Sequence, residues 1–132
     1  MKIIILDDSL TVQMILESFL EDLGVQENEL FTFDDGHDAL KFIEERGADL
    51  IFSDVNMPKM SGSTFVKKIL EIRPDLVSAL FVISADNEKK DLHKMKKVGA
   101  RRFIKKPIES KTFTHFIFPE IVKLRAREDI FA

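Results

Sequence analysis

Three aspartates, a serine and a lysine stand directly after short apolar segments of the chain, and the three carboxylates could together hold a divalent cation. Asp7 and Asp8 follow the first such segment, and the third, fourth and fifth segments are followed by Asp54, Ser84 and Lys106. Three carboxylates at one site repel one another unless a cation and a lysine balance them, and an all-oxygen ligand set suits Mg²⁺ better than Zn²⁺. The residues therefore predict a magnesium site, provided that the fold brings them together.

Each of these residues has an ordinary structural explanation when it is taken alone. Asp often ends a strand or caps a helix, and a Lys-Pro pair such as Lys106-Pro107 is common in loops. Their joint occurrence requires several independent coincidences, however, because open α/β sheets bind ligands at the carboxyl ends of successive strands. We therefore interpret the set as a functional site.

Strand patterns and helix patterns alternate along the chain. Short apolar runs rich in Ile, Val and Phe predict five strands, at residues 2–6, 30–33, 50–53, 80–83 and 102–105. Between and after them, apolar residues recur at spacings of three and four, which predicts a helix between Ser9 as N-cap and Gly24 as stop, and further helices at residues 37–46, 63–72, 88–98 and 112–126. We expect Pro119 to kink or divide the last of these helices.

This alternation predicts an α/β fold. Strands that are apolar throughout and separated by helices form a parallel sheet with helices on both faces, joined by right-handed crossovers. In a doubly wound sheet of five strands the first strand lies centrally, with the third beside it. Asp7, Asp8 and Asp54 should therefore converge in one cleft.

Composition and length narrow the class of protein further. With 132 residues, 45% of them hydrophobic and 33% charged, the chain is expected to form one globular domain over residues 1–132 and is unlike a disordered, collagenous or coiled-coil protein. No apolar run approaches the roughly 18 residues that a membrane span requires, and acids stand where a signal peptide would need a longer apolar stretch. We expect a cytoplasmic protein without a membrane partner, and the absence of Cys excludes disulfides and cysteine-ligated zinc.

The formal net charge of −3 hides an uneven distribution. Residues 89–106 carry nine Lys or Arg and one acid. Basic strips can bind nucleic acid, but no recognition motif accompanies this one, so nucleic acid is not an expected partner. A solvated face or a surface that docks a protein partner is the expected role.

Four motifs carry a specific family resemblance. They are ILDD at residues 5–8, DVNMPKMSG at 54–62, VISA at 82–85 and FIKKP at 103–107. In these residues and their spacing the chain resembles, over nearly its whole length, the receiver domain of two-component response regulators, the CheY-like family. The resemblance implies a single receiver domain with a flavodoxin-like sheet in strand order 2-1-3-4-5.

The resemblance also implies roles for the residues at the strand ends. Asp54 would be the phosphoacceptor, and Ser84 and Lys106 would hold the phosphoryl oxygens. Mg²⁺ would be held by Asp8 directly, by Asp7 through water, by Asp54, and by the backbone carbonyl of Asn56. A carboxylate is a modest nucleophile, so the transfer must rest on positioning and on neutralising charge at the phosphoryl oxygens.

A conformational switch is part of what the resemblance implies. Ser84 would be drawn toward the phosphoryl group, and Phe103 would turn inward to fill the vacated space. The ordinary alternative is that Phe103 is one packing residue among the twelve Phe of this chain. Because Phe has no hydroxyl, any signal that this ring carries must be apolar and steric.

Further expectations concern the loops around the site. The resemblance implies a cis bond between Lys106 and Pro107, and Gly62 would permit a positive φ before the third helix. Asn56 and Asp86 would flank the pocket. There Asp86 would orient the water that hydrolyses the aspartyl phosphate, or its charge would only repel the phosphoryl oxygens. The ordinary alternative is a solvated acid that caps the fourth helix.

The partners implied by the resemblance are proteins. A histidine kinase or phosphotransfer protein would supply the phosphoryl group, and a downstream protein would bind the face formed by the fourth helix, the fifth strand and the last helix. A homodimer on phosphorylation is a further expectation. Residues 128–132 look neither like a linker nor like the start of a DNA-binding module, which favours a stand-alone protein.

Two other functions stay open from the residues alone. One is a Mg²⁺-dependent phosphohydrolase with an aspartate nucleophile, although such enzymes place a second acid two residues after the nucleophile, whereas Asp7 is followed by Asp8 and Ser9. The other is an interaction domain that binds metal and is not phosphorylated. Neither a receiver domain nor an interaction domain is expected to be an enzyme. The exception is that a receiver catalyses its own phosphorylation and dephosphorylation.

Overall fold

The sheet of this protein has five parallel strands in the residues that the computed structural model describes, which are 1–57, 59–85 and 88–131. The strands are β1 (Ile3–Leu6), β2 (Leu30–Phe33), β3 (Leu50–Asp54), β4 (Leu80–Ser84) and β5 (Arg102–Lys105). They lie in the order β2-β1-β3-β4-β5, and each neighbouring pair is parallel. The predicted fold class and strand order are confirmed, and each strand bound agrees with its prediction to within one residue.

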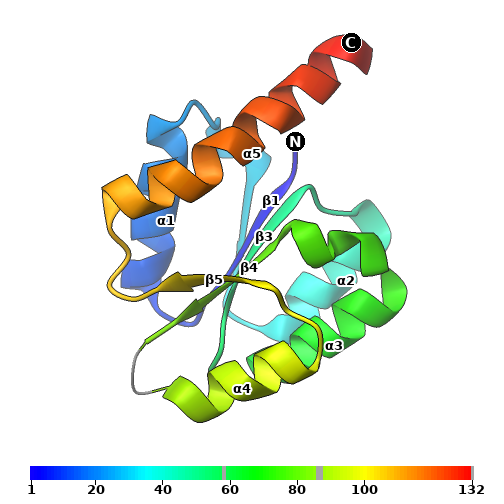
Figure 1. The fold of residues 1–132 in the computed structure, drawn as a ribbon. Coiled ribbons are helices and arrows are strands. Elements are labelled where there is room, and N and C mark those ends of the chain that lie inside the picture. Colours follow the sequence, from blue (N-terminus) through cyan, green and yellow to red (C-terminus); the bar gives the residue numbers. More distant parts are fainter. Residues whose placement is uncertain (58, 86–87, 132) are drawn as a thin grey trace.

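Helices cover both faces of the sheet (Figure 1). They are α1 (Leu10–Asp22), α2 (Gly36–Arg46), α3 (Gly62–Ile72), α4 (Lys89–Lys97) and α5 (Ser110–Phe131), with short 3₁₀ turns η1 (Glu27–Glu29) and η2 (Pro74–Ser78). Helices α1 and α5 lie on one face, and α2, α3 and α4 lie on the other. None of the helices in this part of the chain is long and apolar enough to cross a membrane.

Local signals set where the first helix begins and ends. Ser9 caps α1, because its Oγ accepts a hydrogen bond from the backbone N–H of Val12 at 3.3 Å. Gly24, just beyond the helix, has a φ of 93°, a conformation that glycine adopts without strain. The predicted cap and stop of this helix are confirmed.

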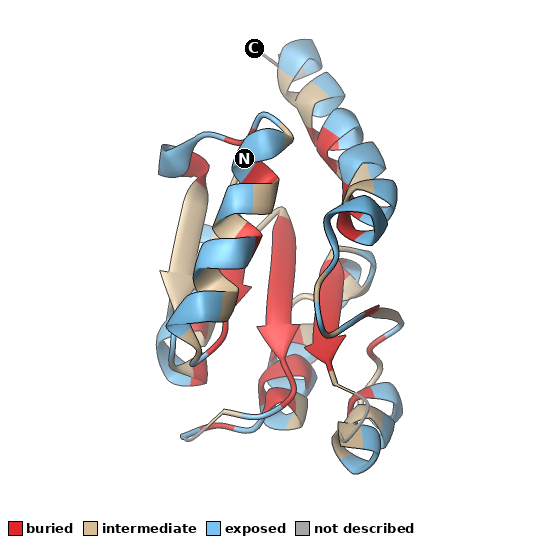
Figure 2. Cartoon of the chain, turned by 90° about the vertical axis from the view of Figure 1, so that its left-hand side faces the viewer, coloured by how far each residue is buried: buried red, intermediate tan, exposed pale blue. Residues whose placement is uncertain are grey.

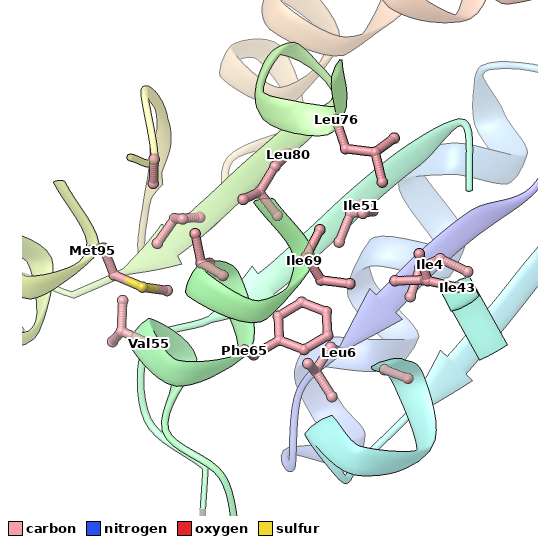
Figure 3. Close-up of a cluster of buried hydrophobic side chains, with 14 of the residues drawn as sticks. Ile4, Leu6, Ile43, Ile51, Val55, Phe65, Ile69, Leu76, Leu80 and Met95 are labelled. Atoms are coloured by element: carbon pink, nitrogen blue, oxygen red, sulfur yellow. The ribbon is translucent and has the colours of Figure 1, made fainter. Parts of the chain in front are cut away.

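Two apolar layers hold the helices to the sheet. The layer under α2, α3 and α4 includes Phe65, Ile69 and Met95 (Figure 3). The layer under α1 and α5 includes Phe52 and Phe113, whose ring centroids lie 5.6 Å apart. Strands β1, β3 and β4 are buried at each residue, whereas the edge strand β2 is half-buried (Figure 2). The central strands are therefore rigid supports for whatever side chains follow them.

Pro119 does not divide the last helix, so of the two outcomes expected from the sequence, a kink or a division, the division is wrong. Helix α5 is continuous through it, runs past the predicted end at residue 126, and projects beyond the sheet (Figures 1 and 2). A proline removes the N–H that would bond to the carbonyl four residues earlier, here that of His115. Both residues are exposed, so this carbonyl can be solvated, while Phe113 and Ile117 on the opposite side of the helix remain buried.

An ion pair between Arg125 and Glu29 connects the C-terminal part of α5 to η1. The guanidinium of Arg125 donates hydrogen bonds to both carboxylate oxygens of Glu29, at 2.6 and 2.7 Å, and another to the backbone carbonyl of Gly24 at 3.0 Å. Glu29 is 9% exposed. The hydrogen bonds from Arg125 are the main reason why the pKa of Glu29 is lowered to about 2.

Glu29→Gln is expected to lower the free energy of unfolding at pH 7 by about 1–2 kcal/mol, because charge-assisted hydrogen bonds contribute on that order. The pKa of Glu29 is about 2 in the folded protein against an ordinary value of 4.5. The contribution should therefore be fully present above about pH 4.5 and be lost as the pH falls toward 2. Urea denaturation at pH 7 and pH 3, followed by circular dichroism, measures this difference.

The control for this experiment is Glu27→Gln, a substitution of an exposed acid in the same turn. It should change the free energy of unfolding at pH 7 by less than about 0.5 kcal/mol. A loss of stability in Glu29→Gln that is as large at pH 3 as at pH 7 would contradict the assigned ion pair.

Candidate functional site

Three aspartates meet at the carboxyl ends of β1 and β3. The two strands are paired so that Leu6 lies opposite Ser53, which brings the residues that follow them to the same edge of the sheet. Carboxylate oxygens of Asp7, Asp8 and Asp54 lie within 4.8 Å of one another. The prediction that the three acids converge at one place is therefore confirmed.

The three carboxyl groups differ in their exposure to solvent. Asp7 is 1% exposed and Asp54 is 4% exposed, whereas Asp8 is an exposed residue. The pKa of Asp7 is raised to about 6, mainly by burial and also by the charges of Asp54 and Asp8, while the hydrogen bond from the Ser9 backbone and the charge of Lys106 act in the opposite direction. The site therefore concentrates negative charge where little water can solvate it.

One oxygen of Asp7 lacks a partner. Its Oδ1 accepts a hydrogen bond from the backbone N–H of Ser9 at 2.8 Å. Its Oδ2 is buried and has no hydrogen-bond partner among the residues that the structure describes. A buried acceptor of this kind is costly unless a further group pairs with it. A hard divalent cation beside three carboxylates would supply that group, so the site fits Mg²⁺.

Lys106 provides the positive charge of the site. Its Nζ donates a hydrogen bond to Asp54 Oδ1 at 3.2 Å, and the same oxygen accepts the backbone N–H of Val55 at 2.8 Å. Burial raises the pKa of Asp54, and Lys106 partly offsets that effect. For Lys106 burial alone would lower the pKa, but the charge of Asp54 and their hydrogen bond raise it overall. The ion pair therefore favours the charged form of Lys106 and partly compensates the cost of burying the Asp54 carboxylate.

The turn after β5 directs Lys106 toward Asp54. The backbone N–H of Lys106 donates to the carbonyl of Ser84 at 2.7 Å, which ties the turn to the end of β4. The bond between Lys106 and Pro107 is cis, the isomer that the family resemblance implied.

Ser84 and Phe103 lie on neighbouring strands. Ser84 is the last residue of β4 and is 6% exposed, one position beyond Ile83, which is paired with Asp54. Phe103 in β5 is half-buried, packs against the apolar layer under α4, and has Lys96 Nζ 5.5 Å from its ring centroid. The ring therefore lies on the α4 side of the sheet, and the switch between the two residues stays a prediction.

Gly62 has a different purpose from the one expected. Its φ is not positive; the positive-φ glycines of the described residues are Gly24, Gly47 and Gly99. A Cβ at Gly62 would lie 2.7 Å from Met95 Cε and 2.9 Å from Val55 Cα, and closer still to the carbonyl oxygen of Asp54. The glycine is required because α3 begins in direct contact with the backbone of the site.

Gly62→Ala is expected to lower the free energy of unfolding by about 1–3 kcal/mol, because the added methyl group meets backbone atoms that cannot move freely. Helix propensity by itself predicts the opposite sign, since Ala is favoured over Gly in a helix. Chemical denaturation of the wild-type protein and of Gly62→Ala shows whether the variant loses stability, as the steric contact predicts, or gains it, as helix propensity predicts.

The matched control is Gly36→Ala, at the first residue of α2. There an added Cβ meets mainly the flexible side chain of Met60, with Sδ at 3.0 Å. This variant should lose less stability than Gly62→Ala. Equal or greater stability of Gly62→Ala relative to wild type would refute the steric explanation.

Asn56 is exposed just after β3, and its side chain contacts α4. Its Nδ2 donates to Glu88 Oε2 at 3.2 Å and to Asp91 Oδ2 at 3.1 Å. Glu88 and Asp91 carry no functional signal in the sequence, because acids at the start of a helix are ordinary capping residues. Asp86, predicted to flank the pocket, lies outside the described residues.

Comparisons with known proteins agree with this geometry. A family model described as the response regulator receiver domain matches residues 3–118. The chain is 30% identical over 107 residues to a probable chemotaxis protein CheY of Rhizobium etli, which covers 80% of this chain and 81% of that protein. A solved structure of the chemotaxis response regulator CheY4 of Vibrio cholerae superposes with a TM-score of 0.76 at 28% identity, over 90% of this chain and 97% of that one.

One further relative has a different name. The chain is 31% identical over 107 residues to a protein-glutamate methylesterase/protein-glutamine glutaminase of Archaeoglobus fulgidus. The match covers 81% of this chain and 30% of that protein, so it concerns only a part of the larger relative.

Proposed function

Because this chain belongs to the response regulator receiver domain family, we propose that it accepts a phosphoryl group on Asp54 from a histidine kinase or phosphotransfer protein. The observation that carries the proposal is the contact of Asp54 with Lys106 at 3.2 Å, beside the two further carboxylates of Asp7 and Asp8. A nucleophilic carboxylate, a cation-binding cluster and a lysine are the groups that transfer of a phosphoryl group requires.

The transfer forms one bond and breaks one. An oxygen of Asp54 attacks the phosphorus, and the bond between phosphorus and the donor breaks with its electron pair leaving on the donor. Lys106 Nζ and the hydroxyl of Ser84 would hold two of the three transferred oxygens. When bound, Mg²⁺ would neutralise the negative charge that accumulates on these oxygens.

The proposed metal ligands are those that the family resemblance implies. We assign Asp8, Asp54 and the backbone carbonyl of Asn56 as ligands, with Asp7 acting through water. The buried, unpartnered Oδ2 of Asp7 supports a role beside a cation. Lys106 keeps its charge next to Asp54 and would remain a partner for the transferred group.

The output of the protein is proposed to pass through the face of α4, β5 and α5. An open groove there is lined by apolar side chains and by side chains of both charges: Phe81, Arg101, Arg102, Phe103, His115, Phe116, Pro119 and Glu120. Phe103 links this groove to the apolar layer under α4. We propose that a downstream protein or a second copy of the chain binds this face.

We also propose that residues 1–132 form one receiver domain and that this domain acts in the cytoplasm.

The experiment is incubation with acetyl phosphate and Mg²⁺, followed by intact-mass measurement. We expect the addition of one phosphoryl group, abolished when EDTA removes the metal. A protein that binds Mg²⁺ but gains no mass, from acetyl phosphate or from phosphorylated histidine kinases, would instead be a metal-binding interaction domain. Repeated turnover of a small phosphate ester would identify a phosphohydrolase.

A further inference from the structure

Asn56 connects the loop after β3 to the start of α4. The amide group of its side chain has two hydrogens, and these are directed to two different acceptors, Glu88 Oε2 at 3.2 Å and Asp91 Oδ2 at 3.1 Å. Glu88 is itself held, because its Oε1 accepts the backbone N–H of Ala85 at 2.8 Å. The contact therefore joins three segments: the loop after β3, the end of β4 and the first turn of α4.

We propose that Asn56, Glu88 and Asp91 form a latch that holds α4 against the loop after β3 and opens when Asp54 is phosphorylated. This inference rests on the proposed function. We call these three residues the Asn56 latch. Within this latch, Glu88 and Asp91 are positioning residues: they act on the site through Asn56 and do not contact the transferred phosphoryl group.

Electrostatics provide the force that opens the latch. Asn56 is two residues from Asp54, and the negative charge of Glu88 acts on both Asp54 and Lys106. A phosphoryl group on Asp54 adds negative charge and repels the two carboxylates of the latch. Its oxygens also compete for the N–H donors of Asn56, since charged phosphoryl oxygens are strong acceptors. Both effects weaken the contact between the loop and α4.

Glu88 and Asp91 could also stabilise α4 simply as acids at its N-terminus, and the test must distinguish that role from the latch. Glu88 is the N-cap residue of α4 and Asp91 is in its first turn, where acids stabilise a helix through its dipole without any help from Asn56. A substitution of either acid would disturb both roles at once. Asn56→Ala is the better test, because it removes the donor and leaves both acids on α4 in place.

The measurement is hydrogen–deuterium exchange of the peptide covering residues 88–95, with and without phosphorylation. In the unphosphorylated protein Asn56→Ala should raise the exchange rate of this peptide by about fivefold, because it removes two exposed hydrogen bonds whose combined net effect is about that of one buried hydrogen bond. Asn28→Ala, which changes an exposed Asn in η1, is the control and should leave the rate unchanged. An unchanged rate in Asn56→Ala would show that the latch does not hold α4.

Phosphorylation with acetyl phosphate and Mg²⁺ gives the second comparison. We expect the wild-type exchange rate to rise toward that of unphosphorylated Asn56→Ala, and the rate of the variant to change little further. If the phosphorylated wild-type protein shows no faster exchange of residues 88–95, the proposal that phosphorylation opens the latch is wrong. If wild-type protein accepts no phosphoryl group, the proposed function and the opening fail together, while the unphosphorylated comparison still decides whether the latch exists.

Discussion

Asp54→Asn is expected to abolish the incorporation of a phosphoryl group from acetyl phosphate and Mg²⁺. The substitution keeps the size of the side chain and an oxygen that can accept the hydrogen bonds of Val55 and Lys106, but an amide is not a nucleophile toward phosphorus. Intact-mass measurement after incubation should show only the unmodified variant, under conditions that label the wild-type protein.

The control for this prediction lies at the other end of the same strand. Asp49 directly precedes β3, and its carboxylate accepts the backbone N–H of Lys2 at 2.7 Å. Asp49→Asn should be labelled as the wild-type protein is, because it changes the same residue type far from the carboxyl ends of the strands. Undiminished labelling of a folded Asp54→Asn protein would assign the phosphoacceptor to another residue.

Asp8→Ala is expected to weaken Mg²⁺ binding by at least about tenfold, because it removes a carboxylate from the coordination sphere of a hard cation. Asp8 is exposed, so its loss leaves the apolar layers intact. It also relieves the repulsion with Asp7 and Asp54, and the metal-free variant should be at least as stable as the metal-free wild type. Titration calorimetry is suitable, because the chain has no Trp or Tyr that could report binding by fluorescence.

Asp34→Ala is the matched control for the metal site. Asp34 is also exposed and also follows a strand, β2, but it is outside the cluster of three aspartates. It should leave the Mg²⁺ affinity within about twofold, since Asp34 contributes no oxygen to the cluster and an exposed charge is partly screened by water and salt. Equal affinities in wild type and Asp8→Ala would contradict the assignment of Asp8 as a ligand.

Most of the fold was predictable from local patterns. Buried parallel strands require continuous apolar runs, and helices that cover a sheet require apolar residues at spacings of three and four, so the two patterns distinguish the elements and their order. The carboxyl ends of parallel strands meet at one edge, which is why Asp7, Asp8 and Asp54 could be placed together before their separations were known. Ser9 as a cap depends on residues within one turn, and it too was predicted.

Pro119 and Gly62 show where local rules stop being sufficient. A proline is expected to break a helix, but α5 continues because its apolar side packs on the sheet on both sides of an exposed ring. Gly62 seemed to be needed for a positive φ, yet what requires it is the closeness of Met95 and of the backbone at Val55. Neither neighbour could be identified from the residues adjacent to Gly62 in the chain.

The sequence by itself determined the alternation of strands and helices, the edge of the sheet that carries the chemistry and the identity of the charged residues there. The full order of the strands within the sheet was implied by the family resemblance. Only the tertiary structure decided which atoms of those residues are satisfied: Asp7 Oδ2 is left without a partner among the described residues, while Lys106 Nζ reaches Asp54. It also decided that Asn56 bonds to Glu88 and Asp91, more than thirty residues away. The reason is physical: strand and helix patterns record which face of an element is buried, whereas contacts between side chains depend on how helices and loops are placed against the sheet.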